Sequence, residues 1–298
     1  MNNKTKAIIF VLICTCTSDI GAFLTKYILL ESFTPMQTIF MRTGIRIIPL
    51  LFIIPFLNGF TFKTKIPFDH FYRCALGAST AFLLTYGTKY VSLAESTVIG
   101  YMVPVFFSIL CCSFFQEKMT VPKASVIGIS FFGVLVSMDF NADSFHVASI
   151  AIFIAALFSA MHRLFIKKVS QIDHPILGNF YMNIFLLSAS CLSLFLDDWS
   201  ALSLKHAPIL LVLGSLSFLT QFLSSKALSI CEGSILAPID YISFITVIVL
   251  EYFIQSVVPG LNVIVGGLMI IGANLYHLKR EVLNDDIWND SGRDKKAY

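Results

Sequence analysis

The sequence is poor in charge for its length. Only 13% of its 298 residues are Asp, Glu, Lys or Arg, whereas 56% are hydrophobic and 29 are phenylalanine. Soluble domains usually carry about 25% charged residues, so the composition excludes an ordinary soluble protein. The formal net charge of +3 reflects where Lys and Arg fall along the chain and gives no sign of a nucleic-acid partner.

The sequence also lacks the signatures of a metal site, a disulfide framework or an enzyme. It contains no His-Glu-x-x-His segment, no glycine-flanked serine elbow and no phosphate loop. His162 and His206 have no partners at ligand spacing. The seven cysteines, an odd number in or beside apolar segments, match no metal motif and are interpreted as small core residues. We therefore expect no metal, no cofactor and no enzymatic activity.

What the sequence does contain is ten long apolar blocks. Each is close to the roughly 20 residues that a membrane-spanning helix needs. Backbone polar groups inside lipid must be paired internally, and the blocks lack the alternation of barrel strands, so a helical bundle is favoured. We predict an all-α membrane protein with ten transmembrane helices. The blocks lie near residues 8–30, 34–57, 71–91, 94–115, 122–140, 146–166, 176–196, 207–230, 234–255 and 259–278.

The positions of Lys and Arg predict an orientation. Sixteen of them fall on one side of the ten blocks, whereas only Lys89 and Lys205 fall on the other. Positive residues favour the cytoplasmic side, so both termini are predicted to be cytoplasmic, in a bacterial inner membrane. The first block contains Asp19 and Lys26 and has no small-residue cleavage site, so it is interpreted as a retained span. Residues 279–298 form a polar tail.

One stretch of thirteen residues occurs twice in the sequence, the second time in a looser form. "SLAESTVIGYMVP" at 92–104 returns loosely as "SICEGSILAPIDY" at 229–241, an offset of 137 residues. Five spans separate the two copies, and because five is odd the second half must be inverted relative to the first, as in secondary transporters. We predict two inverted five-helix repeats, residues 1–140 and 141–278. Chance similarity is the alternative, and the equal span counts argue against it.

Each copy opens with Ser-x-x-Glu, the pattern of a capping box, in which Ser and Glu satisfy free amides at a helix start. Ser92 with Glu95, and Ser229 with Glu232, are therefore interpreted as helix caps in preference to substrate ligands. Prolines inside helices kink them. Hinge roles are predicted for the two prolines nearest the repeated stretch, with fold scaffolding as the alternative; these are Pro104 and Pro238.

Several segments resemble the EamA-type repeats of the drug/metabolite transporter superfamily over nearly the whole chain. They include "IFMRTGIRIIPLLFIIP" with Arg42, the stretch from "YGTKYVSLAEST" through Pro104, and "KALSICEGSILAPIDY" with Pro238 and Tyr241. One departure is that the second half has Ile where the family pattern repeats a Glu near residue 254, with Glu251 one turn earlier.

Within that superfamily the chain resembles the S-adenosylmethionine uptake carriers of obligate intracellular bacteria. The matching pieces include "SDIGAFLTKYI" and "LLVLGSLSFLTQFLSSKALSICEGSILAPIDY". This resemblance implies import of S-adenosylmethionine, in exchange for S-adenosylhomocysteine. Related carriers move amino acids or other small metabolites, and an exporter of such solutes is the alternative. A small zwitterionic molecule is the expected partner, beside membrane lipid; the oligomeric state is left open.

Ionisable residues inside the spans are the candidate binding groups, because each costs about 2.5–3.5 kcal/mol at a helix centre. Asp19 lies roughly 18 Å into the first span, and Arg42 roughly 12 Å into the second from the opposite side. Arg46 is one turn further on the same face. Asp19 can pair with either arginine in a purely structural ion pair, or leave one guanidinium for a substrate carboxylate. Lys26 is expected to reach water at the outer end.

The ninth span carries two acids on one face. Asp240 and Glu251 are eleven residues apart, about three turns of helix, so both are predicted to line the interior and attract a cation. The aromatic rings of Tyr86, Tyr101 and Tyr241 are candidates for holding a sulfonium or stacking an adenine, with simple packing as the alternative. The predicted substrate-binding residues are Asp19, Arg42, Arg46, Tyr86, Tyr101, Asp240, Tyr241 and Glu251.

Overall fold

The protein is described from a computed structural model in which every regular element of the described residues is a helix. The all-helical prediction is therefore confirmed for that part of the chain. The structure describes residues 3–31, 33–56, 61–114, 121–137, 147–170, 172–192, 195, 199–200, 204–230, 242–255 and 258–276.

The first five predicted blocks correspond to α1 to α6, and the last five to α7, α8, α10, α12 and a final helix. The bounds are α1 (Asn3–Leu30), α2 (Pro35–Ile53, extended by a 3-10 turn at Ile54–Phe56), α3 (Pro67–Tyr90), α4 (Leu93–Gly100), α5 (Met102–Phe114), α6 (Val121–Ser137), α7 (Val147–Ser170), α8 (Pro175–Cys191), α10 (Ala207–Ile230), α12 (Ile242–Leu250, extended by a π-helical turn at Glu251–Gln255) and the helix Leu261–Tyr276.

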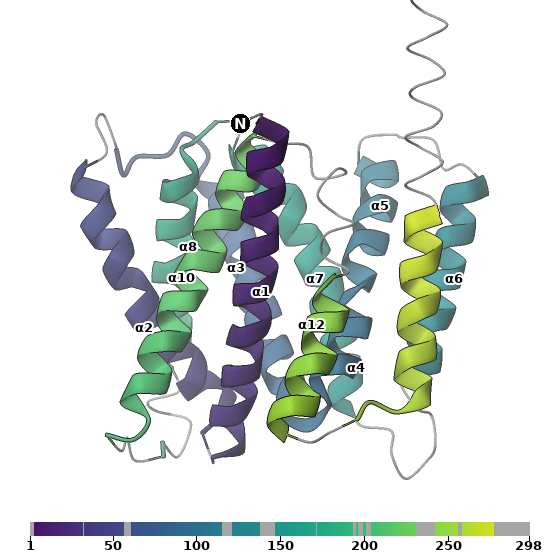
Figure 1. Ribbon diagram of the computed structural model, residues 1–298. Coiled ribbons are helices and arrows are strands. Elements are labelled where there is room, and N and C mark those ends of the chain that lie inside the picture. Colours follow the sequence, from purple (N-terminus) through teal and green to yellow (C-terminus); the bar gives the residue numbers. More distant parts are fainter. Residues whose placement is uncertain are drawn as a thin grey trace, which may run out of the picture.

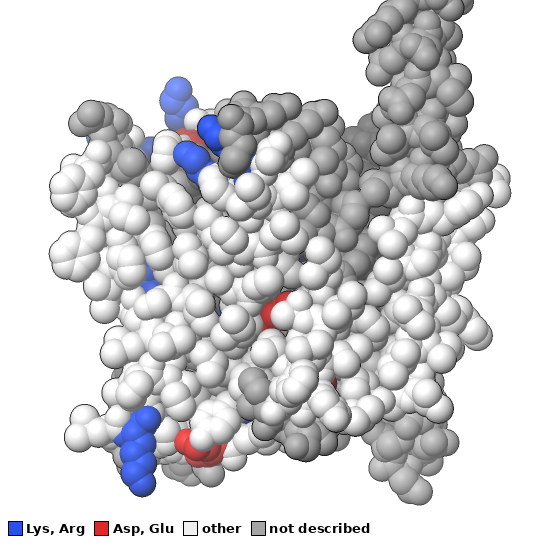
Figure 2. Space-filling view, viewed as in Figure 1, with Lys and Arg blue, Asp and Glu red and all other residues white. Residues whose placement is uncertain are grey.

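Four of these helices are both long enough and apolar enough to cross a membrane. Mean hydropathy over their best windows is 1.7 to 2.1. They are the helical segments Thr5–Leu30, Pro35–Phe56, Val147–Ile166 and Ala207–Ser224. Shorter apolar helices occupy most of the remaining blocks. Figure 2 shows the corresponding surface, with Lys and Arg gathered toward the two ends of the bundle and a broad band between them that carries little charge.

Several helices begin where the sequence offers a cap followed by proline. The Thr34 side chain accepts a hydrogen bond from the Gln37 amide, with Pro35 in the first turn of α2. His174 Nδ1 accepts from the Ile176 amide in the same way, with Pro175 opening α8. A side-chain acceptor satisfies one of the amides that have no partner in the first turn, and proline is preset for that turn.

The predicted fourth span is broken at Tyr101 into α4 and α5. The Tyr101 amide bonds to the carbonyls of Thr97 and Val98, which ends α4. Pro104 follows in the first turn of α5, and because proline has no N–H it cannot donate to the Gly100 carbonyl four residues earlier. The break therefore has a local cause in the sequence. A hinge role for Pro104 stays a prediction.

The helices stand roughly side by side, and neighbours in space are often distant in sequence (Figure 1). The two most extensive pairings join α1 to α10 and α3 to α7. Close approach is possible where glycine replaces a side chain: a Cβ on Gly87 would lie 2.2 Å from Ile152 Cγ1, and one on Gly214 would lie 2.4 Å from Ile45 Cγ2. At one edge, α6 lies against Leu261–Tyr276, where a Cβ on Gly266 would lie 2.3 Å from the Gly133 carbonyl oxygen.

Candidate substrate site

The centre of the site is a pair of arginines on one face of α2. Arg46 is only 8% exposed, and Arg42 lies one turn before it. Ile39, two turns before Arg46 on the same face, packs with Cys74 and Met182 from α3 and α8. The side of α2 that carries Arg46 therefore faces the interior of the bundle.

Among the described residues, no carboxylate lies within ion-pair distance of either arginine. Among the described residues, Arg42 Nε and the Nε and Nη2 atoms of Arg46 are buried without a hydrogen-bond partner. Ion pairs in that part of the chain involve other residues. Guanidinium groups one helical turn apart repel each other, and unpaired charge in a low-dielectric interior is strongly unfavourable. The arrangement is therefore suited to an anionic ligand, and arginine matches a carboxylate with two parallel hydrogen bonds.

Asp19 does not form the ion pair that its depth allows. Its Oδ1 accepts a hydrogen bond from Ser243 Oγ of α12 at 2.6 Å, and the carboxylate is buried. Over the ranges that the structure describes, neither Arg42 nor Arg46 lies within ion-pair distance of it. The pairing suggested by the sequence is wrong because depth along two helices does not determine which faces of those helices meet.

Uncharged polar side chains continue the polar interior between α1, α8 and α10. Thr17 and Thr220 share a hydrogen bond of 2.9 Å between their hydroxyls, and Asn183 Nδ2 donates to Gln221 Oε1 at 3.4 Å. Asn183 is almost fully buried. None of these four residues was among the predicted site residues. The available signal was amides inside otherwise apolar spans, which are expensive in lipid unless they meet a partner.

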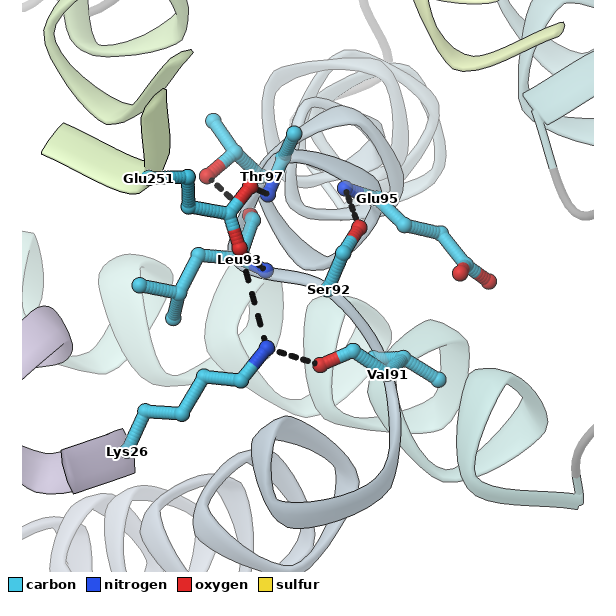
Figure 3. Close-up of polar contacts among 8 residues, drawn as sticks. Lys26, Val91, Ser92, Leu93, Glu95, Thr97 and Glu251 are labelled. Carbon is cyan, nitrogen blue, oxygen red and sulfur yellow. Dashed lines mark hydrogen bonds and ion pairs between the residues drawn. The ribbon is translucent and has the colours of Figure 1, made fainter. Parts of the chain in front are cut away.

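The Glu251 carboxylate is bonded to the protein backbone and does not face an open site. It is 0% exposed, and its two carboxylate oxygens accept hydrogen bonds from the backbone amides of Leu93 at 2.7 Å and Ala94 at 3.2 Å. Figure 3 shows it pointing at the start of α4, with Lys26 approaching from α1. Lys26 Nζ lies 3.6 Å from Glu251 Oε1 and donates to the Val91 carbonyl at 2.8 Å. The expectation that Lys26 reaches water is therefore wrong.

The cap at Ser92 is present in the structure. Its hydroxyl accepts from the Glu95 amide at 3.0 Å, as Figure 3 shows. Glu95 Oε1 accepts from Ser149 Oγ of α7 at 2.7 Å. With Glu251 at the Leu93 and Ala94 amides and the Ser92 carbonyl bonded to the Ser96 amide, the first four amides of α4 all have partners.

The predicted tyrosines lie in different surroundings. Tyr86 is 40% exposed, and its ring is tilted against Tyr90 at a centroid distance of 5.1 Å. Tyr101 is buried, edge-on to Phe244 at 6.5 Å. The structure therefore does not bring these two rings together with one another. The predictions at Glu232, Pro238, Asp240 and Tyr241 lie outside the described residues, as does the side chain of Ser229 in the last turn of α10.

Apolar helices that enclose unbalanced cations and amides are typical of membrane transport proteins, in which polar groups inside the bundle mark a path for solutes. The chain belongs to the EamA-like transporter family, whose model matches residues 5–138 and 146–276. It is therefore a multi-pass membrane protein of transporter type, and the family and the relatives it matches are transporters, not enzymes.

Among curated relatives, the S-adenosylmethionine uptake transporter of Rickettsia conorii is 27% identical over 91% of this chain and 91% of its own length. The riboflavin transporter of Brucella anthropi is also 27% identical, over 71% of this chain and 76% of its own. The pseudopaline exporter of Pseudomonas aeruginosa is 24% identical, over 67% and 71%. One crystal structure, at 12% identity, shares the fold with a TM-score of 0.57, covering 91% of this chain and 93% of that one.

Proposed function

We propose that the protein is a secondary transporter that imports S-adenosylmethionine across the bacterial inner membrane, in exchange for S-adenosylhomocysteine. The observation that carries the proposal is the pair of buried Arg46 and half-buried Arg42 on α2, which have buried nitrogen atoms without a partner among the described residues. Both solutes carry an α-carboxylate that two guanidinium groups would hold. The similarity to S-adenosylmethionine uptake transporters, which extends over 91% of the chain, supports the same substrate.

The charge of the site helps to choose between candidate substrates. Riboflavin has no carboxylate and is uncharged near neutral pH, so it would leave Arg42 and Arg46 unbalanced. S-adenosylmethionine brings one carboxylate for the arginines, and its ammonium and sulfonium groups need acidic or aromatic surroundings. We assign that second role to Asp19, Asp240 and Tyr241. Glu251 is assigned to holding the start of α4 in place of its predicted role as a ligand, since both of its oxygens are already occupied.

The proposal includes an inverted-repeat architecture with ten transmembrane helices. The repeats are residues 1–140 and 141–278, with residues 279–298 as a cytoplasmic tail and both termini in the cytoplasm. If the halves are equivalent, the packing of α1 on α10 should have a counterpart in α7 on α3, and that of α2 on α10 a counterpart in α8 on α3. Both pairs of contacts are present, which supports the repeat. Pro104 and Pro238, one in each copy of the repeated stretch, are then proposed as hinges.

An exporter of amino acids or related metabolites is the second candidate. The match to a pseudopaline exporter over 67% of the chain favours it, and the same arginine pair would serve any carboxylate-bearing solute. The two candidates share the fold and differ in the direction of net transport and in whether the S-adenosyl group is recognised.

The decisive test is uptake of radiolabelled S-adenosylmethionine by a heterologous bacterium that does not import it. The intact chain is compared with Arg42→Gln, Arg46→Gln and, as the matched control, Arg163→Gln, whose arginine is exposed on α7. We expect saturable uptake that excess S-adenosylhomocysteine blocks and excess riboflavin does not. Loss of one guanidinium bonded to a carboxylate should raise the half-saturating concentration of S-adenosylmethionine about tenfold or more. The control should behave as the intact chain.

Two results would count against the proposal. If the protein is correctly inserted in the membrane and shows no uptake, S-adenosylmethionine import is excluded. Efflux of preloaded amino acids would then support the exporter. Uptake that is equally strong in Arg42→Gln and Arg46→Gln would leave the substrate in place but remove the arginine pair from its binding site.

A further inference from the structure

A second group of basic side chains with buried nitrogen atoms lies away from the arginine pair, where α3, α7 and α8 meet. Arg73 is on α3 and His162 on α7, and Gly178 is in the first turns of α8. By its position in the sequence Arg73 is one of the sixteen basic residues on the predicted cytoplasmic side, yet it is only 5% exposed.

Two glycines make room for these side chains. A Cβ on Gly178 would lie 2.3 Å from Arg73 Nη1, and a Cβ on Gly77 would lie 3.1 Å from His162 Nε2. A distance of 2.3 Å is far below van der Waals contact, so no residue larger than glycine fits at 178 without displacing the guanidinium. The guanidinium therefore occupies a space that exists only because α8 has no side chain there.

Three nitrogen atoms of this group lack hydrogen-bond partners among the described residues. Within the described part of the chain, Arg73 Nε, Arg73 Nη1 and His162 Nε2 are buried and have no hydrogen-bond partner. Buried polar atoms are normally paired, and a native exception calls for an explanation such as a bound ligand. Here three such atoms from two helices lie in the same region.

The described acids near this end of the bundle, Asp173 and Asp69, have other partners. Asp173 Oδ2 accepts from Thr64 Oγ1 at 2.5 Å and from His70 Nε2 at 2.9 Å. Asp69 pairs with Lys168 at 2.8 Å. The N-terminal end of α8 adds the positive end of a helix dipole. The local charge is therefore positive and, among the described residues, has no bonded carboxylate to balance it at Arg73.

We propose that Arg73 and His162 form a second anion-binding station, which receives the carboxylate of the transported solute on its way between Arg46 and the cytoplasm. The carboxylate is the class of ligand because it offers two acceptor oxygens to a guanidinium and one to an imidazole N–H. In this form the inference rests on the proposed function, since it takes the solute to be one that carries a carboxylate.

The depths of the arginines suit a sequence of stations. The chain enters α2 and α3 from opposite ends of the bundle (Figure 1). At 1.5 Å per residue Arg42 and Arg46 lie roughly 10 and 16 Å into α2, and Arg73 lies roughly 9 Å into α3 from the other end. A carboxylate moving inward from Arg42 to Arg46 would then meet Arg73, so that at each depth a fixed cation would replace part of its lost hydration.

The test compares the two faces of the membrane. Exchange of S-adenosylmethionine is measured in right-side-out and inside-out vesicles carrying the intact chain, Arg73→Gln, His162→Gln or the exposed-site control Arg163→Gln. We expect Arg73→Gln to raise the half-saturating concentration about tenfold or more in inside-out vesicles and less than threefold in right-side-out vesicles, with His162→Gln acting in the same direction. Decarboxylated S-adenosylmethionine should be insensitive to both substitutions.

A binding measurement separates this site from the proposed function. The unfolding midpoint of the purified full chain is followed as acetate replaces chloride at constant ionic strength, because an anion that binds only the folded state raises the midpoint. The rise should be smaller in Arg73→Gln than in Arg163→Gln, and absent in Arg46→Gln/Arg73→Gln. If Arg73→Gln does not accumulate, Gly178→Ala, which displaces the guanidinium without removing it, takes its place.

The outcomes are distinct. An acetate response that depends on Arg73, in a chain that does not transport S-adenosylmethionine, would keep the anion station and overturn the proposed substrate. An acetate response unchanged by Arg73→Gln and by Gly178→Ala would overturn the station even if transport is normal. Equal weakening on both vesicle faces would also overturn it, because Arg73 would then act on the fold as a whole.

Discussion

Glu251 Oε1 accepts a hydrogen bond from the backbone amide of Leu93 at 2.7 Å across 158 residues of sequence. The acid comes from the end of α12 in the second half of the chain, and the amide opens α4 in the first half. The other oxygen of the same carboxylate bonds to the Ala94 amide, and Lys26 lies 3.6 Å away. One fully buried side chain therefore holds three helices together.

The first prediction concerns this carboxylate. Glu251→Gln keeps the shape of the side chain, but it leaves a single acceptor oxygen for two amides and no negative charge for Lys26. Removing one partner of a buried ion pair costs about 3 kcal/mol or more, so the unfolding midpoint of the purified protein should fall clearly. Combining it with Lys26→Met should recover part of the loss, since no unbalanced ammonium remains. Equal stability of Glu251→Gln and the intact chain would contradict the account.

The second prediction concerns Asp173, which lies outside the membrane-spanning segments between α7 and α8. Burial raises the pKa of this carboxyl, but hydrogen bonds from Thr64 and His70, with the charges of His70 and Lys65, outweigh it and lower the pKa below its ordinary value of 3.8. A lowered acid pKa contributes stability above the unfolded-state pKa, and that stability disappears as the pH falls through the folded-state pKa.

The unfolding midpoint should therefore be steady from neutral pH to about 5 and drop as the pH passes below about 4, as carboxylates with native partners become protonated. Asp173→Asn should lower the midpoint at pH 6 and make the acid-side decline shallower. A decline of the same steepness in Asp173→Asn and in the intact chain would show that other groups are responsible for it.

The third prediction concerns glycine in the contact between α3 and α7. In Gly87→Val, the new Cβ would lie 2.2 Å from Ile152 Cγ1 and 3.1 Å from the Ala148 carbonyl oxygen. Overpacking of this kind costs typically 1–3 kcal/mol, and about 3 kcal/mol is expected where backbone is in the way. Gly128→Val is the matched control in α6, because a Cβ at Gly128 meets nothing within 4 Å. Thermal unfolding in detergent compares the two, and similar midpoints would refute the close packing.

The local structure was largely predictable from the sequence. Apolar blocks of membrane-spanning length located the helices, because a backbone in lipid must satisfy its own hydrogen bonds. Ser92 marked the start of α4, and Pro104 explains why the fourth block is broken at Tyr101. These features depend on residues within a few positions of one another.

The partners of the buried charges were not predictable in this way. Asp19 was expected beside an arginine and meets Ser243, and Lys26 was expected at water and meets Val91 and Glu251. Arg73 was counted among the basic residues of the cytoplasmic side and is buried. Periodicity gives the face of a helix on which a residue lies. It does not give the neighbour toward which that face is turned.

The sequence by itself determined that this chain is a bundle of apolar helices, how its helices start and break, and that a few charges must lie inside. It also indicated the arginine pair on α2, since two charges one turn apart in an apolar run are costly and need a purpose. Only the tertiary structure decided which charges are neutralised within the protein and which have buried atoms without a partner among the described residues. The reason is that neutralisation depends on distances of a few ångströms between helices far apart in sequence, and those distances are set by how all the helices pack together.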